Sequence, residues 1–188
     1  MTETVVPYRA RKLMLDDLMR RLAAVTLVAF DVDGTLTDGR IGIIGTGDRV
    51  LFFNTHDGHG IAALRSIGVD VAFVTANRSN AVEDRAERLK VTYRILGRDD
   101  KKAALEELGI LWERIAYVGD DLNDIGPMLH AGVSFAVANA RPEAMAAAHH
   151  VLTLPGGHGA AREVCDLILR AKGYEIFAGP DGAEWRKS

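Results

Sequence analysis

Short apolar segments rich in valine and isoleucine alternate with stretches of helical periodicity along most of this chain. The apolar segments are 25–30, 69–74, 92–96, 115–118, 133–137 and 151–154. The helical stretches between them are 60–67, 79–89, 100–108, 123–131 and 141–148. Strands that alternate with helices are typical of a parallel sheet covered on both faces. The pattern therefore predicts an α/β fold with a doubly wound, Rossmann-like parallel sheet.

The alternating part is framed by two other segments. Charged and apolar residues at helical spacing in 11–23 predict a helix within an N-terminal segment, 1–24. The main domain is expected at 25–172, which is an ordinary size for one domain. Residues 173–188 contain glycine, proline and charge, and we expect a tail that is mobile or used in contacts.

One segment, 37–55, interrupts the alternation. Two β-prone runs, 40–44 and 49–53, flank Gly45-Thr46-Gly47-Asp48, which is a signal for a β-hairpin. Because it follows the first strand, the hairpin is expected to lie as a flap over the end of the sheet where open α/β folds bind ligands.

Charge and cysteine content exclude several classes of protein. The net charge is −3 and no run of Lys or Arg occurs, which argues against nucleic acid or a polybasic membrane anchor as partners. The apolar run 22–30 is too short to cross a bilayer. Cys165 is the only cysteine, so no intrachain disulfide forms. We expect a cytoplasmic protein without a membrane segment.

Polar residues lie at or just beyond the carboxyl ends of four of the predicted strands. Because the carboxyl ends of parallel strands meet at one edge of a sheet, these side chains are expected to lie in one crevice. They are Asp31 and Asp33 in Asp31-Val32-Asp33-Gly34-Thr35, then Thr75, then Lys101, and finally Asp120, Asp121 and Asp124.

So many carboxylates at one place repel one another unless a cation lies among them. Oxygen ligands without His or Cys suit Mg²⁺. Lys101, the Thr75 hydroxyl and backbone N–H groups add donors, which together with a metal stabilise the charge on a transferring phosphoryl group. A carboxylate is also able to act as the nucleophile. The residues thus predict magnesium-dependent phosphoryl transfer.

Over 25–165 this pattern resembles the haloacid dehalogenase superfamily of phosphatases. The resemblance implies that Asp31 is the nucleophile and a Mg²⁺ ligand, and that Asp33 is the general acid and base, with its backbone carbonyl on the metal. Asp120 would be the third protein ligand of the metal. Thr75 and Lys101 would hold the phosphoryl oxygens.

The same resemblance places Asp124 and Asp121 behind these residues, where they would orient the metal-bound waters and Lys101. Both acidic residues also suit the start of a helix, and the two roles are compatible.

A closer resemblance is to the capless 3-deoxy-D-manno-octulosonate 8-phosphate (KDO 8-phosphate) phosphatases, which carry a short hairpin instead of a cap domain. It rests on Asp31-Val-Asp-Gly-Thr-Leu-Thr-Asp-Gly39, Phe53-Asn-Thr-His-Asp57-Gly58-His-Gly60-Ile61, Val82-Glu-Asp-Arg85, Tyr117-Val-Gly-Asp-Asp-Leu and Gly156-Gly-His-Gly-Ala-Ala-Arg162-Glu163-Val. It implies a phosphorylated sugar-acid substrate, a place in lipopolysaccharide precursor synthesis, and a homotetramer whose hairpins pack together.

The residues that surround the entrance to the site and contact the substrate, called the rim below, are expected to include His56, Asn77, Arg78, His158 and Arg162. Three of these positions differ from the family pattern. The family usually has Thr-Gly-Arg where this chain has Thr75-Ala76-Asn77. It also usually has Arg or Lys where His56 stands, and often Arg where His158 stands. Alternatives therefore stay open: a nine-carbon sugar-acid 9-phosphate as substrate, a phosphoacceptor signalling module, or a catalytically silent scaffold.

Overall fold

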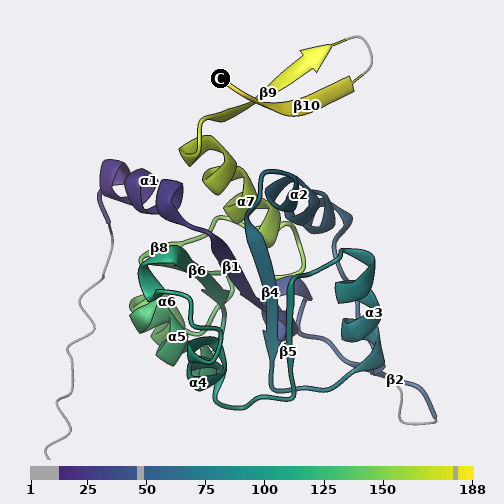
Figure 1. The fold of residues 1–188 in the computed structure, drawn as a ribbon. Helices are drawn as coiled ribbons and strands as arrows, with labels where there is room; N and C mark the ends of the chain where they lie inside the picture. The colour runs from purple at the N-terminus through teal and green to yellow at the C-terminus, as the bar shows by residue number, and fades with distance from the viewer. Residues whose placement is uncertain (1–12, 46–48, 180–181) are drawn as a thin grey trace, which may run out of the picture.

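The computed structural model describes residues 13–45, 49–179 and 182–188. Its centre is a parallel sheet with the strand order β5-β4-β1-β6-β7-β8 (Figure 1). The strands are β1 (Leu27–Asp31), β4 (Asp70–Thr75), β5 (Tyr93–Leu96), β6 (Ile115–Gly119), β7 (Val133–Ala136) and β8 (His150–Val151). Every pair of neighbouring strands in this sheet runs parallel, which confirms the predicted doubly wound α/β fold.

Helices cover both faces of the sheet. On one face α7 (Ala160–Ala171) packs against α1 (Leu15–Ala24) and α2 (Thr55–Ser66), with α3 (Asn80–Arg88) on the side of α2 (Figure 1). On the other face α5 (Ile125–His130) packs against α4 (Lys101–Glu106) and α6 (Pro142–Ala147). Two short turns, η2 (Trp112–Arg114) and η3 (Leu122–Asp124), precede β6 and α5.

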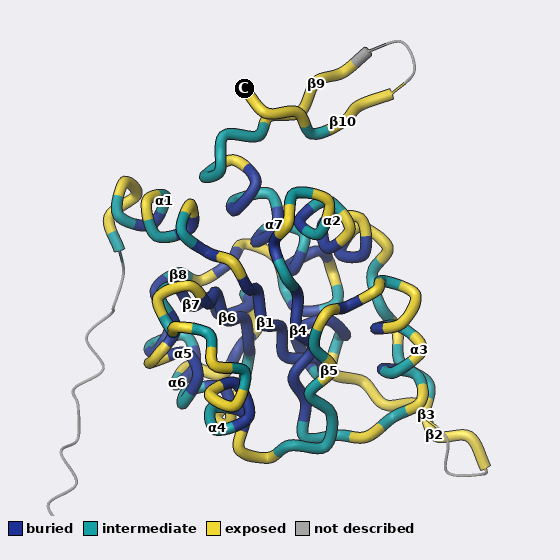
Figure 2. The backbone as a smooth tube through the Cα atoms, viewed as in Figure 1, coloured by how far each residue is buried: buried dark blue, intermediate teal, exposed yellow. Residues whose placement is uncertain are grey.

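The sheet forms the core, and its central strands are buried along their whole length (Figure 2). Burial on both faces explains why these strands are continuous apolar runs rather than alternating ones. The largest fully buried apolar side chains, each worth roughly 1.5–3 kcal/mol of transfer free energy, include Phe30, Phe73 and Phe135.

The predicted flap hairpin is present. Strands β2 (Gly42–Ile43) and β3 (Arg49–Val50) pair antiparallel, and a single bridge between Thr37 and Phe53 closes the base of the hairpin. Of the predicted Gly-Thr-Gly-Asp turn, residues 46–48 lie outside the described residues. The described residues show no cap domain between β1 and α2.

The C-terminal segment forms a hairpin where we expected a tail. β9 (Tyr174–Gly179) and β10 (Gly182–Lys187) pair antiparallel, with Ile176 opposite Trp185, and the hairpin projects beyond α7 (Figure 1). Residues 1–12, which include the start of the predicted N-terminal helix, lie outside the described residues. The domain boundaries at 24 and 172 stay predictions. No helix among the described residues is long and apolar enough to cross a membrane.

Candidate active site

The site begins where β1 ends. β1 lies between β4 and β6, and its carboxyl end leads into an irregular helical turn, Val32–Leu36. From β1 the chain continues to β4 and β5 on one side, and from β5 it returns past β1 to β6 on the other side. The strand order thus reverses at β1, which is where open α/β sheets form a ligand crevice. Asp31, the last residue of β1, is 3% exposed at this point.

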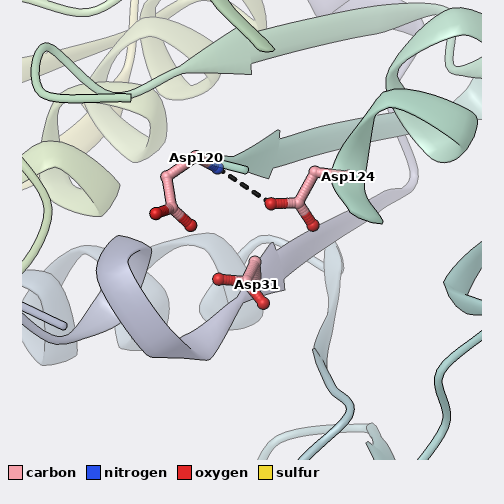
Figure 3. A group of neighbouring side chains, drawn as sticks. All are labelled: Asp31, Asp120 and Asp124. Carbon is pink, nitrogen blue, oxygen red and sulfur yellow. Dashed lines mark hydrogen bonds between the residues drawn. The ribbon is translucent and has the colours of Figure 1, made fainter. Parts of the chain in front are cut away.

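Three carboxylates meet in the crevice. Asp31 comes from β1, Asp120 from the end of β6, and Asp124 from the end of η3, and one oxygen of each lies within 4.8 Å of the others (Figure 3). Asp124 is fixed from behind, because its Oδ2 accepts the backbone N–H of Asp120 at 2.9 Å and of Asp121 at 3.1 Å.

A buried lysine links two of these carboxylates. Lys101 is the first residue of α4, a helix capped by the side chain of Asp100, and it is 2% exposed. Its Nζ donates to Asp31 Oδ1 at 2.5 Å and to Asp124 Oδ1 at 2.7 Å. The Tyr117 hydroxyl donates to the same Asp124 oxygen at 2.6 Å. The lysine therefore sits in a buried network that orients its ammonium group.

One ammonium group does not offset three carboxylates. Burial, and then the charge of Asp124, raise the pKa of Asp31 well above its usual range. The same two causes raise the pKa of Asp120 to about 6. Burial lowers the pKa of Lys101, but the charges of Asp31 and Asp124 outweigh that effect and raise it. The carboxylates thus carry more negative charge than Lys101 neutralises in this poorly solvated site.

These residues fit a magnesium ion. Oδ2 of Asp31 is buried and has no hydrogen-bond partner among the described residues, which is costly for a carboxylate oxygen. A cation beside Asp31 and Asp120 would satisfy that oxygen and reverse the rise in both pKa values. The donors are oxygens alone, the set that Mg²⁺ prefers.

A second group of polar side chains adjoins the first. Asp33 lies in the turn after β1, and its Oδ2 accepts the Thr75 hydroxyl at 2.8 Å and the Asn77 side-chain amide at 2.9 Å. The backbone N–H of Asn77 donates in turn to the Thr75 hydroxyl oxygen at 3.0 Å. The end of β4 thereby positions the side chain of Asp33.

Two glycines let the backbone approach this closely. Gly34 has φ +95°, and a Cβ there would lie 2.3 Å from Oδ2 of Asp120. A Cβ on Gly156 would lie 1.7 Å from the carbonyl oxygen of Gly34. The neighbouring Gly157 donates its N–H to the carbonyl oxygen of Thr35 at 3.0 Å. The 155–159 loop therefore packs directly against the turn that carries Asp31 and Asp33.

The predicted rim residues are spread around the crevice. His56 and His158 are exposed, and Asn54 joins their segments: it accepts the N–H of His56 at 2.8 Å and donates to the carbonyl oxygen of Gly157 at 3.3 Å. Arg78 is exposed, and its Nε would lie 2.4 Å from a Cβ on Gly97, at the end of β5.

Arg162 and Asp121 have partners outside the carboxylate group. The guanidinium of Arg162 donates to Asp166 at 2.6 Å. Asp121 is exposed, and its side chain caps η3 by accepting the N–H of Leu122 at 2.7 Å. The capping that we expected of Asp121 is thus present.

Sequence reasoning assigned no role to several polar residues that the structure brings near the site. Tyr117 holds Asp124, and Arg85 donates to the carbonyl oxygen of Asn54 at 3.0 Å. Asp57 is 2% exposed and accepts the backbone N–H of Arg162 at 2.8 Å. For Tyr117 the available signal was a hydroxyl inside an otherwise apolar strand, but that signal does not identify the partner. Arg85 and Asp57 lie in helices with several other polar residues, so no local pattern distinguishes them.

The fold and the site define a class of protein. A parallel sheet with carboxylates at the ends of β1 and β6, and a lysine after β5, is the arrangement of the haloacid dehalogenase-like hydrolases. The sequence model of that family matches residues 100–163.

Curated relatives narrow the class. The KDO 8-phosphate phosphatase of Yersinia pestis is 43% identical over 161 residues, which cover 84% of this chain and 86% of that protein. The enzyme of the same name from Escherichia coli strain K12 is 40% identical over 161 residues, with the same coverage.

Solved structures agree. The crystal structure of the Yersinia pestis enzyme superimposes with a TM-score of 0.81, over 84% of this chain and 87% of that one, at 43% identity. The structure of the Moraxella catarrhalis enzyme in complex with a magnesium ion, a phosphate ion and KDO superimposes with a TM-score of 0.82. The superposition covers 85% of this chain and 94% of that one, at 37% identity. This chain belongs to the family of KDO 8-phosphate phosphatases.

Proposed function

We propose that this protein hydrolyses 3-deoxy-D-manno-octulosonate 8-phosphate to the free sugar acid and phosphate, with Mg²⁺ as cofactor. The observation that carries the proposal is the group of buried Asp31, Asp124 and Lys101 with half-buried Asp120 at the carboxyl end of β1. The relatives named for this reaction cover most of the chain at 40% identity or more.

In the first step a carboxylate oxygen of Asp31 attacks the phosphorus atom. The bond from phosphorus to the substrate oxygen breaks, and that oxygen takes the electron pair together with a proton from Asp33. Lys101 and the Thr75 hydroxyl hold phosphoryl oxygens, which stabilises the charge of the transition state. The product is an aspartyl-phosphate on Asp31.

In the second step water replaces the aspartate. Asp33, now ionised, takes a proton from the water as it attacks phosphorus, and the bond between phosphorus and Asp31 breaks. Asp31 regains its carboxylate, Asp33 regains its proton, and inorganic phosphate leaves. Asp124 keeps Lys101 in place in both steps through the 2.7 Å contact.

Mg²⁺ would be held by the side chains of Asp31 and Asp120 and by the backbone carbonyl of Asp33, and it would neutralise phosphoryl charge. Asp124, and with it Asp121, would orient the waters of the ion.

For the rim we propose His56, Asn77, Arg78, His158 and Arg162 as residues near the sugar acid. Arg78 supplies the best carboxylate partner, because guanidinium binds carboxylates through two hydrogen bonds and Arg78 has no ion pair with the described residues. Arg78→Ala should raise the Michaelis constant for the sugar acid more than for an aryl phosphate, and equal effects would contradict this role.

A substrate panel tests the proposed reaction. Phosphate release is measured with KDO 8-phosphate, a nine-carbon sugar-acid 9-phosphate, a neutral hexose phosphate and an aryl phosphate. We expect the highest kcat/KM for KDO 8-phosphate. A higher value for the nine-carbon acid would reassign the substrate, and no preference for sugar acids would leave only a general phosphatase. A single stoichiometric burst without turnover would indicate a phosphoacceptor instead.

We also propose a homotetramer built through the flap hairpins, and a cytoplasmic location. The support for the assembly is exposed apolar surface on one small element: Ile43 is 78% exposed and Phe52 is 68% exposed. Such surface on a lone hairpin is typical of an interface. Ile43→Glu should dissociate the assembly in light scattering, whereas Leu111→Glu, at a site 70% exposed elsewhere, should not. A wild-type monomer at micromolar concentration would contradict the proposal.

A further inference from the structure

The Asn77 side chain contacts Asp33, the residue that donates and accepts protons in the reaction proposed above. Its amide Nδ2 lies 2.9 Å from Oδ2 of Asp33, on the same oxygen that accepts the Thr75 hydroxyl at 2.8 Å. Both hydrogen bonds converge on one oxygen, which leaves Oδ1 of Asp33 for the proton that is exchanged with substrate or water. The arrangement therefore fixes the carboxylate without using its reactive oxygen.

The two donors are not equivalent during turnover. A hydroxyl has a single hydrogen to donate, whereas a side-chain amide has two. When Thr75 turns its hydrogen toward a phosphoryl oxygen, as the proposed reaction requires, its bond to Asp33 is lost. The amide of Asn77 has no competing partner among the described residues, so its bond remains.

Asn77 is itself held in place. Its backbone N–H donates to the Thr75 oxygen at 3.0 Å, a contact that uses a lone pair of that oxygen and not its hydrogen. Asn77 directly follows β4, whose residue Thr75 is 1% exposed, so the amide is carried by a rigid element of the sheet. Rigid support is what a positioning group needs, because small displacements of a reacting group cost much of its rate.

We propose that Asn77 is the positioning residue for Asp33, and that its amide keeps the Asp33 carboxylate in place while the Thr75 hydroxyl binds the phosphoryl group. This inference rests on the proposed function, and it gives Asn77 a role toward the proton-transfer residue in addition to its proposed place near the sugar acid.

The leaving group separates this role from a structural one. An alkyl phosphate, such as a sugar phosphate, needs a proton from Asp33 as its alkoxide leaves. p-Nitrophenyl phosphate does not, because p-nitrophenolate is a stable anion. Both substrates need Asp33 as a base in the second step. A positioning defect should therefore affect the first step with the alkyl phosphate and leave the first step with the aryl phosphate intact.

The experiment compares Asn77→Leu, which keeps the size and removes the donor, with Asn80→Leu, the same change at an exposed residue of α3. For Asn77→Leu we expect kcat with the sugar phosphate to fall roughly 10- to 150-fold, the range for a lost hydrogen bond to a charged group, with little change in KM. The first-turnover release of p-nitrophenol should keep its wild-type rate, while steady-state turnover slows. Asn80→Leu should match the wild type.

Magnesium binding, measured by calorimetry, should be unchanged by Asn77→Leu. The unfolding temperature is recorded for each variant and should stay above the assay temperature, so that the rates report folded protein. An equal fall in the p-nitrophenol burst would overturn the inference, because Asn77 would then act on phosphoryl transfer. Unchanged rates, faster rates, or lost magnesium binding would overturn it as well. If the wild type prefers a neutral sugar phosphate, the proposed substrate fails, but the leaving-group comparison is still made with that alkyl phosphate.

Discussion

Removal of the Tyr117 hydroxyl tests how far the buried network controls Lys101. Tyr117 lies in the middle of β6 with no exposed surface, and its hydroxyl donates to Asp124 at 2.6 Å. Burial, and then the negative charges of Asp124 and Asp31, raise the pKa of the phenol well above its usual range. The hydroxyl therefore stays protonated and keeps donating to the carboxylate that holds the lysine.

Tyr117→Phe removes only this hydrogen bond. A hydrogen bond to a charged group contributes about 1.5–3 kcal/mol, and for a chain of this length each kcal/mol shifts the unfolding temperature by about 2–4 °C. We expect the unfolding temperature to fall by about 3–12 °C. The value of kcat should fall more than KM rises, because Asp124 orients Lys101 less firmly.

The measurements are calorimetric unfolding and steady-state phosphate release. Tyr93→Phe on β5 is the matched control, because the Tyr93 hydroxyl makes no hydrogen bond to the described residues, and this variant should resemble the wild type in both measurements. If Tyr117→Phe unfolds at the wild-type temperature and keeps its kcat, the hydroxyl does not support the network and the reasoning is wrong.

Three more predictions concern charge in and near the site. Lys101→Met should abolish turnover. Without Mg²⁺ it should also lower the free energy of unfolding by about 3–5 kcal/mol, because it leaves buried carboxylates unpaired. A variant that is stable in denaturant unfolding and active in rate assays would contradict this. Mg²⁺ at 100 times its dissociation constant should stabilise the wild type by about 2.7 kcal/mol, which is measured as a rise in the unfolding temperature. Asp120→Asn should lose most of this rise, and a rise as large as that of the wild type would exclude Asp120 as a ligand. Burial raises the pKa of Asp57, so the folded state retains this proton to higher pH than the unfolded state, and ionisation weakens folding as pH rises through the folded pKa. Asp57→Asn should therefore gain stability relative to the wild type between acid and neutral pH, and the opposite trend in denaturant unfolding would refute this.

The sequence was sufficient to predict the sheet and the residues that meet at its edge. Asp31, Thr75 and Asp120 follow directly from strand ends, because parallel strands bring their carboxyl ends together whatever loops intervene. Lys101 was predictable for the same reason, since α4 begins just after β5.

Contacts between distant segments were not predictable in this way. Tyr117 in an apolar strand resembles an ordinary core residue, and only the structure shows its hydroxyl on Asp124. The need for glycine at 156 arises from the carbonyl oxygen of Gly34, which no local pattern reveals. The C-terminal hairpin did have a local signal, Gly179-Pro180-Asp181-Gly182, whose residue types favour a turn.

The central claim is that Asp31 carries the phosphoryl group between substrate and water. The most direct test is rapid acid quenching during turnover with Mg²⁺ and an aryl phosphate, followed by mass spectrometry of the protein. We predict a phosphoryl group on the peptide that contains Asp31, and neither phosphorylation nor turnover in Asp31→Asn. Turnover that continues in Asp31→Asn, or a phosphoryl group on a different residue, would contradict the account.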